Sequence, residues 1–395
     1  MARITEIEAF EIYPEYQDFN GLYLARTHGR QSQGRTVFIV RTGDGLEGLG
    51  EQWGLGADVE ALRRRYVGTD PFDWINSQVD LRICMATYDL MGKMLGVPAW
   101  KLIGPRVRSW VPVAAWTVAR PPADMAEEVR RAAAAGYRWI KFHLDQVQNV
   151  LDQTAAMQEA APEGFRVHYD FNANLSFYTI CPILLELERF PVAGRIEDPM
   201  DPGDEDGYRL LKEKCKLPII THHGPAEFMV RKICDGFMSG HAPVGSAARL
   251  AAVAEMTRTP LMLQNAGGVI NQAFLAHQAA VFPAATIDHV DLCHLWKEDV
   301  TAEEMPVVGG TVQVPEGPGL GVTLDRERLE KCASQQPMNR GRFLVRVRYA
   351  DGTAVYVRHD PDQPGSTDSM RSLERLHGLD APSNVPSYAA PVAAA

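Results

Sequence analysis

The feature that most constrains the fold of this chain is a repeat of short apolar strand, turn and amphipathic helix that begins at Val111. Eight apolar segments in this part of the chain are typical of strands. The last polar residues of six successive segments are His143, Asp170, Glu197, His223, His241 and Gln264. They are separated by 27, 27, 26, 18 and 23 residues, which is the spacing of a strand–helix unit. Eight such units within about 200 residues predict a closed parallel (β/α) barrel rather than a doubly wound sheet.

Such a barrel predicts where a functional site lies, because residues at the carboxyl ends of its strands point into one site. The strand ends here carry Lys141 and His143, Asp170 and Asn172, Glu197 and Asp198, and His222 and His223. The strand interiors beneath them are expected to be apolar filling. Two carboxylates at adjacent strand ends could hold a hard divalent cation. A lysine or histidine beside them could act as a general base.

The N-terminal part of the chain predicts a small sheet followed by helices. The segments ITEIEAFEIY and RTVFIVRT alternate in the manner of strands. Gly43, Gly45 and Gly48 match the GxGxxG pattern of a dinucleotide site, which requires a helix at the third glycine. The sequence after Gly48 is instead extended, and Asp44-Gly45 has the chemistry of a tight turn, so we predict a hairpin. Residues 58–103 have apolar residues at helical spacing.

The segments after the eighth strand differ from the repeat. VVGGTVQVPEGPGLGVTLDRERLEK is predicted to leave the barrel and to pack on the N-terminal sheet. GRFLVRVRYADGTAVYVRH predicts an additional hairpin around Asp351-Gly352, and a tail follows His359. The expected domains are an N-terminal capping part (1–110), the barrel (111–310) and a C-terminal segment that returns to the cap (311–395).

Composition argues against several classes of protein. The 40 Lys and Arg residues against 50 Asp and Glu give a formal charge of −10, the wrong sign for a nucleic-acid partner. No apolar run approaches the ~18 residues that span a bilayer, and the acidic first segment does not suit a signal peptide. Six scattered cysteines without a CxxC pair are typical of reduced thiols. We expect a cytoplasmic protein with no nucleic-acid or membrane partner.

Five segments in a fixed order resemble the enolase superfamily, and within it the branch of mandelate racemase, muconate lactonizing enzyme and acid-sugar dehydratases. They are YDLMGKMLGVPAWKLIGP, WIKFH, YDFNAN, RIEDP and VPEGPGLGVTLD. The resemblance extends over nearly all of residues 1–330. It implies an α/β fold with a modified TIM (β/α)8 barrel and an α+β capping domain made from both ends of the chain. It also implies a Mg2+ site, a small carboxylate substrate and assembly as a homo-oligomer.

The resemblance also implies roles for several strand-end residues. Asp170 and Glu197 match the first two metal ligands, and Lys141 matches a lysine that helps to hold the substrate carboxylate. His143 stands where the second lysine or an alternative base would be, and Asn172 matches a polar residue near the metal. The implied reaction removes the proton beside the carboxylate and forms a metal-stabilised enediolate. A dication and a cationic side chain stabilise the charge that develops.

Two departures from the family pattern leave alternatives open. The third ligand is usually a carboxylate, but PIITHHG places His223 there, and imidazole suits Zn2+, Fe2+ or Mn2+ better than Mg2+. The family's histidine–aspartate dyad is absent, since the sixth and seventh strand segments are FMSGH and LMLQN. A two-base racemase would lack one base, whereas a one-base dehydration would keep His143.

The predicted function is therefore a metal-dependent lyase, a dehydratase acting on a hydroxy carboxylic acid such as an acid sugar. The predicted cofactor is Mg2+, with Mn2+ or Zn2+ as alternatives. Further candidates for substrate binding or for the general acid are Asn172, Asp198, His222, His241, Gln264, Asn265, Tyr23, Arg26 and His28. Alternatives are a racemase or epimerase of the mandelate racemase type and a non-catalytic anion-binding relative. A third is a zinc hydrolase built on His222, His223, Asp170 and Glu197.

Overall fold

The computed structural model describes residues 2–28, 34–77, 79–144, 148–173, 175–265 and 267–336, and the short strands at 343–348, 354–359, 387–388 and 392–393. The chain forms two compact units. Unit 1 comprises Met1–Gln17, Gln33–Val113 and Phe237–Pro337, and unit 2 comprises Asp18–Ser32, Ala114–Gly236 and Met338–Ala395. The division into residues 1–110, 111–310 and 311–395 stays a prediction.

Unit 1 contains a three-stranded antiparallel sheet in the order β1-β2-β3. Its strands are β1 (Ile4–Ile12), β2 (Arg35–Thr42) and β3 (Glu47–Trp53). The β2–β3 hairpin turns at the predicted Gly43–Gly45 segment, and β3 continues as a strand through Gly48. The hairpin prediction is confirmed, and no helix begins at Gly48.

Helices and the C-terminal segment of unit 1 pack on this sheet. The helical elements within residues 58–103 are α2 (Val59–Tyr66), η2 (Pro71–Trp74), α3 (Leu81–Leu95) and α4 (Trp100–Ile103). Asp70 caps η2 with Pro71 at its start, and Gly96 ends α3 in a left-handed conformation, which explains why the helical region is broken. Leu320 and Val322 share one core with the strands, as predicted. α12 (Arg326–Ser334) follows this segment.

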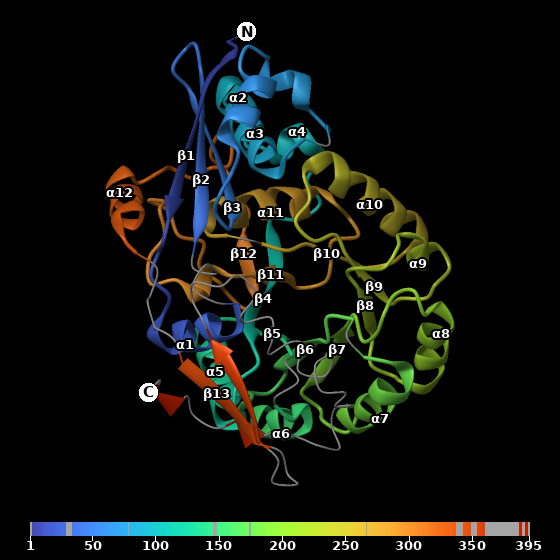
Figure 1. The fold of residues 1–395 in the computed structure, drawn as a ribbon. Coiled ribbons are helices and arrows are strands. Elements are labelled where there is room, and N and C mark those ends of the chain that lie inside the picture. The colour runs from blue at the N-terminus through green and yellow to red at the C-terminus, as the bar shows by residue number, and fades with distance from the viewer. Residues whose placement is uncertain are drawn as a thin grey trace. The chain divides into compact units, whose positions relative to one another are not determined.

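All eight strands predicted from Val111 onward are present (Figure 1). They are β4 (Trp110–Val118), β5 (Trp139–His143), β6 (Arg166–Asp170), β7 (Ala193–Glu197), β8 (Ile219–Thr221), β9 (Gly236–Met238), β10 (Leu261–Met262) and β11 (His289–Asp291). The sheet order is β10-β9-β8-β7-β6-β5-β4-β11, and β12 (Thr311–Gln313) pairs with β4. β4 to β8 pair in parallel. The fold is therefore an α/β modified barrel with a capping part, as the sequence predicted.

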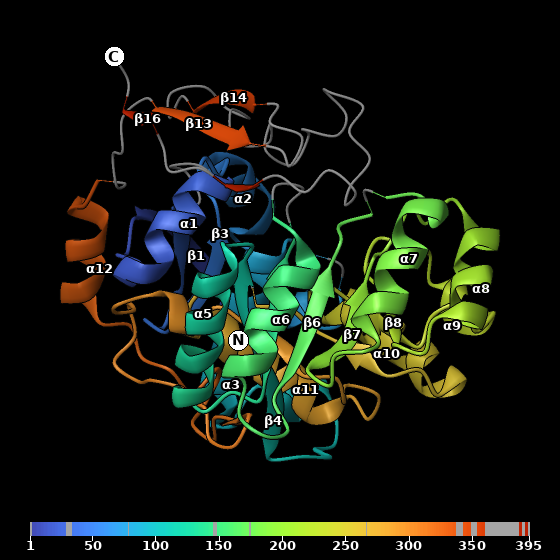
Figure 2. The same cartoon turned by 90° about the horizontal axis from the view of Figure 1, so that it is seen from below.

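Helices alternate with these strands. They are α5 (Pro122–Ala134), α6 (Val150–Ala160), α7 (Phe177–Leu187), α8 (Glu205–Lys214), α9 (Glu227–Val230), α10 (Val244–Thr257), α11 (Val269–Val281) and the short η3 (Cys293–Leu295). Side chains of Asn149, Ser176 and Asp204 cap α6, α7 and α8 by accepting backbone N–H bonds. Figures 1 and 2 show α7 and α8 on the outer side of β7 and β8.

Two further segments of unit 2 complete the description. The helix α1 (Asp18–His28) lies in a stretch where the sequence predicted none. β13 (Phe343–Arg348) and β14 (Ala354–His359) pair antiparallel, which confirms the additional hairpin, whereas its turn at Asp351-Gly352 lies outside the described residues. The short strands β15 (Ser387–Tyr388) and β16 (Val392–Ala393) pair with β13.

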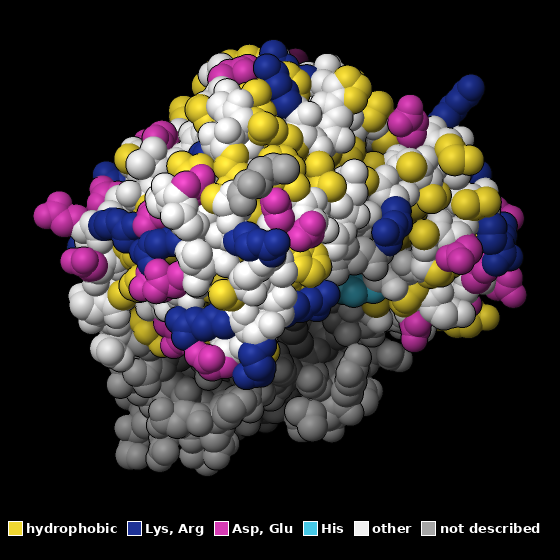
Figure 3. All heavy atoms as spheres, turned by 90° about the horizontal axis from the view of Figure 1, so that it is seen from above, with side chains coloured by type: hydrophobic (Ala, Val, Ile, Leu, Met, Phe, Trp, Pro, Cys, Tyr) yellow, Lys and Arg dark blue, Asp and Glu magenta, His cyan; other side chains and the backbone are white. Residues whose placement is uncertain are grey.

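The charged side chains are mixed on the face of the molecule drawn in Figure 3. Lys and Arg side chains lie among Asp and Glu side chains there, in keeping with a composition in which acidic residues only moderately outnumber basic ones. None of the described helices combines the length and the apolar character that a bilayer crossing requires.

Candidate active site

Three adjacent parallel strands of unit 2 present two polar rows on one face. Side chains two residues apart lie on the same face of a strand, and the parallel register aligns them across strands. The lower row consists of Lys141 on β5, His168 on β6 and Arg195 on β7. The upper row, at the carboxyl ends, consists of His143, Asp170 and Glu197. Except for His143, all of these residues are buried.

Lys141 lies between the two carboxylates. Its Nζ is 2.8 Å from Glu197 Oε1 and 3.1 Å from Asp170 Oδ2. Burial opposes the charged form, but the two carboxylates outweigh it and raise the pKa of Lys141. Burial and Glu197 act to raise the pKa of Asp170, yet Lys141 and His143 lower it to about 2. The three groups are therefore all ionised at neutral pH.

His168 and Arg195 continue this network below the strand ends. Arg195 Nε donates to His168 Nδ1 at 3.0 Å, so the imidazole proton of His168 is on Nε2. This Nε2 atom lies 2.8 Å from Glu197 Oε2. Burial lowers the pKa of His168 to about 4, so the ring is neutral at pH 7. The expectation of apolar strand interiors is wrong here. The period of two could have found both residues, since they precede Asp170 and Glu197 by two positions.

His143, the predicted base, is the most accessible member of the two rows. Its Nε2 lies 3.0 Å from Asp170 Oδ2, and its side chain is 15% exposed. The ring meets Trp116 edge-on, with 5.0 Å between ring centroids. A histidine held by a carboxylate is the usual arrangement of a general base. The structure thus joins His143 and Lys141 through one carboxylate, that of Asp170.

The turns after β6 and β7 pass through left-handed residues. Asn172 has φ 53°, and its backbone N–H donates to Asp170 Oδ1 at 2.9 Å. Asp198 has φ 41° and is fully buried. Its Oδ1 accepts the His222 N–H at 2.8 Å, and its Oδ2 accepts the His223 N–H at 3.2 Å. The Asp198 carboxylate therefore holds the loop that follows β8.

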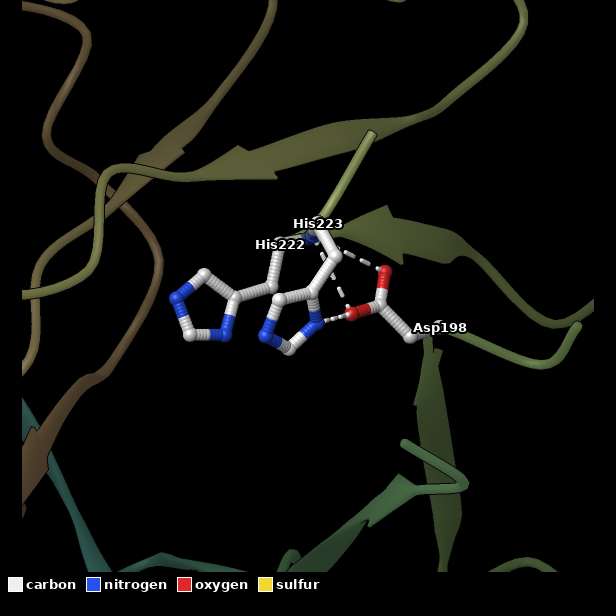
Figure 4. Close-up of side chains that lie close together, drawn as sticks. All are labelled: Asp198, His222 and His223. Carbon is white, nitrogen blue, oxygen red and sulfur yellow. Dashed lines mark hydrogen bonds and ion pairs between the residues drawn. The ribbon is translucent and has the colours of Figure 1, made fainter. Parts of the chain in front are cut away.

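His222 and His223 extend from this loop. His223 Nδ1 lies 2.5 Å from Asp198 Oδ2, and this hydrogen bond raises the pKa of His223 (Figure 4). His222 Nδ1 lies 3.5 Å from Glu197 Oε1. Within the described residues, one group of three or more side chains brings metal-ligand atoms within 4.8 Å of one another: Asp198, His222 and His223. The ligand set Asp170, Glu197 and His223 stays a prediction, and His223 is directed to Asp198.

Three predicted binding residues lie in unit 1. His241 and Gln264 line one small cavity. Asn265 is buried and holds the turn before α11, since its Oδ1 accepts the Gly267 N–H at 2.6 Å and its Nδ2 donates to Gln272 at 3.0 Å. These contacts give Asn265 a local role in the turn. Substrate binding by the three residues stays a prediction.

The predicted specificity residues of the N-terminal part lie on α1. The Tyr23 hydroxyl donates to Asp124, and the Arg120 guanidinium lies 4.9 Å from the centre of its ring. Tyr23 is thus engaged within unit 2. Arg26 and His28 belong to α1, but their side chains lie outside the described part of the structure.

The donors at these strand ends are of two kinds, the carboxylates of Asp170 and Glu197 and the imidazoles of the next strand end. Mg2+ takes an octahedral shell of oxygens, usually one or two carboxylates with water and substrate. The ammonium of Lys141 contacts both Asp170 and Glu197, and the next strand end offers imidazoles. Imidazole suits Zn2+ and other transition metals. The two carboxylates suit Mg2+ or Mn2+ and the imidazoles suit Zn2+, so the choice among the three metals predicted from the sequence stays a prediction.

Comparisons with known proteins support the assignment of the chain to the modified barrel fold. A D-xylonate dehydratase of Haloferax volcanii is 26% identical over 344 residues, covering 74% of this chain and 83% of that protein. An N-succinylamino acid racemase of Thermus thermophilus is 27% identical over 347 residues, covering 76% and 91%. A solved racemase of Streptomyces coelicolor with bound magnesium has a TM-score of 0.67 at 21% identity, covering 83% and 99%.

These relatives are enzymes of different reactions at almost equal identity, so they support enolase-superfamily chemistry without selecting one reaction. The model of the family described as enolase C-terminal domain-like matches residues 124–328, which is more than half of the chain. That match contains β5 to β11 and all the strand-end residues described above. The chain therefore belongs to the enolase C-terminal domain-like family of the enolase superfamily.

Proposed function

We propose that this chain is a dehydratase that removes water from a hydroxy carboxylic acid of the acid-sugar class. The observation that carries the proposal is the connection of His143 and Lys141 through Asp170, which places a base and a cation on one face of β5. The relative named as a D-xylonate dehydratase favours the acid-sugar class.

In the proposed reaction His143 accepts the proton of the carbon beside the substrate carboxylate. Because Asp170 lies against Nε2, the basic nitrogen of His143 is Nδ1. The electron pair of the broken C–H bond moves into the carboxylate and forms an enediolate. The enediolate then expels the hydroxyl group of the next carbon, which takes up a proton and leaves as water. The resulting enol tautomerises to a 2-keto acid.

Lys141 supplies positive charge from beneath His143. Its side chain is 0% exposed, and its ammonium group keeps Asp170 and Glu197 ionised. A fixed cation in a water-excluded site stabilises developing negative charge without having to reorganise. In this proposal Lys141 offsets part of the negative charge that Asp170 and Glu197 would otherwise present to the enediolate, and Asp170 acts as a positioning residue for His143.

The proposal is tested with a panel of sugar acids and N-succinylamino acids in D2O, in the presence of Mg2+, Mn2+ or Zn2+. A dehydratase produces a 2-keto acid, measured as its semicarbazone, and His143→Asn abolishes the product. His359→Asn, which changes a histidine of β14, is the control and keeps wild-type turnover. NMR detects deuterium at the α-carbon of recovered substrate.

The outcomes separate the alternatives. Deuterium exchange without keto acid supports a racemase or epimerase and contradicts dehydration. Binding without exchange or substrate loss supports a non-catalytic anion-binding protein. Turnover that survives in His143→Asn refutes the assignment of the base.

A further inference from the structure

The loop after β8 carries two consecutive histidines next to a buried carboxylate. Asp198 is fully buried, whereas the side chains of His222 and His223 are 23% and 58% exposed. Their ring centroids lie 4.3 Å apart with 37° between the planes. Potential ligand atoms of all three residues lie within 4.8 Å of one another. The cluster is thus accessible from solvent on its imidazole side.

The Asp198 carboxylate orients the cluster. It accepts both backbone N–H groups of the two histidines and the Nδ1–H of His223. With Nδ1 on Asp198, the remaining ring nitrogen of His223 is directed towards the His222 ring (Figure 4). Metal-binding histidines usually present one nitrogen to the ion while a carboxylate holds the other. The geometry of His223 has this form before any ion binds.

The charges around the cluster also favour a cation. Among the described residues Asp198 forms an ion pair with His223, while Lys141 is engaged by Asp170 and Glu197. A buried carboxylate needs a compensating positive charge. A divalent ion held by the two imidazoles would place such a charge beside Asp198.

We propose that His222 and His223, with Asp198 holding the His223 ring, form a site for a divalent metal that accepts nitrogen ligands, such as Zn2+ or Co2+, in preference to Mg2+. The site is separate from the Asp170–Glu197 pair that Lys141 contacts, and it does not depend on the proposed reaction. Zn–N bonds of about 2.0–2.1 Å require the ligand atoms to move closer together than they are in this structure. The exposed His223 ring can make that movement.

Titration of the metal-free protein with Co2+ tests the proposal directly. After dialysis against EDTA, one equivalent of Co2+ is expected to produce the visible absorption of a nitrogen-ligated ion. Zn2+ is expected to displace it, and a large excess of Mg2+ is not. His222→Gln and His223→Gln should each weaken Co2+ binding at least ~10-fold, given the size of such effects at metal sites.

Asp170→Asn is the comparison variant, because Asp170 lies in the neighbouring network and not in the proposed ligand set. It should leave Co2+ affinity within about twofold of wild type. Circular dichroism spectra establish that each variant is folded, and the partly exposed positions of both histidines make replacement tolerable. The proposal is overturned if Co2+ does not bind, if both histidine variants bind it normally, or if Asp170→Asn alone abolishes binding.

Discussion

Replacement of Lys141 by methionine tests the central ion-pair network most directly. Methionine keeps an unbranched apolar stem but removes the ammonium group that lies 2.8 Å from Glu197 and 3.1 Å from Asp170. The carboxylates then remain 0% and 3% exposed with no ammonium between them. Removal of one partner of a buried ion pair costs about 3–5 kcal/mol. We expect the free energy of unfolding at pH 7 to fall by this amount.

The loss should shrink as the pH falls. In the wild type the pKa of Asp170 is about 2, below its ordinary 3.8, so its stabilising contribution is present above pH 3.8 and is lost towards pH 2. In Lys141→Met burial instead raises the pKa values of the two carboxylates. The folded variant then binds protons at a higher pH than the unfolded chain does. Its stability relative to the wild type therefore recovers between about pH 7 and pH 5.

Urea unfolding followed by circular dichroism at pH 7 and pH 5 measures both effects. Lys212→Met is the matched control in unit 2, because Lys212 pairs with Asp235 at 2.8 Å while the two side chains are 26% and 39% exposed. Exposed pairs of this kind contribute under about 1 kcal/mol. Equal losses for the two variants, or a loss in Lys141→Met that is independent of pH, would refute the reasoning.

Two further predictions concern other buried charges. Arg35→Met should lower the free energy of unfolding by about 3–5 kcal/mol, since Arg35 is 0% exposed between two carboxylates. Arg41→Met on the same strand should cost under about 1 kcal/mol because its ion pairs are partly exposed; similar urea midpoints would contradict this. Burial lowers the pKa of His168 and of His277 to about 4, so the unfolded chain binds protons between pH 6.5 and 4 that the folded chain does not. The free energy of unfolding, measured with urea, should therefore fall as the pH is lowered from 6.5 to 4. His277→Gln should make this dependence on pH less steep, and an unchanged dependence would exclude His277 as a contributor.

Most of the fold follows from local patterns in the sequence. The apolar segments with polar ends, spaced as strand–helix units, correctly located β4 to β11. The Asp44-Gly45 turn located the β2–β3 hairpin. α1 was missed because its apolar residues are not gathered on one helical face. A helix without an amphipathic pattern depends on tertiary packing for its stability, and that packing has no local signal in the sequence.

The sequence by itself determined that Lys141 and His143 share one face of β5, because a strand has a period of two. The spacing of the strand–helix units also placed Asp170 and Glu197 at the ends of the next two strands. Only the tertiary structure decided the partners of these residues. The parallel register set Lys141 against both carboxylates, and the turn at Asp198 brought its carboxylate to His223 Nδ1. The physical reason is that a buried charge is neutralised by whichever group a neighbouring strand brings within contact distance, and residues about 27 positions apart carry no local signal of that contact.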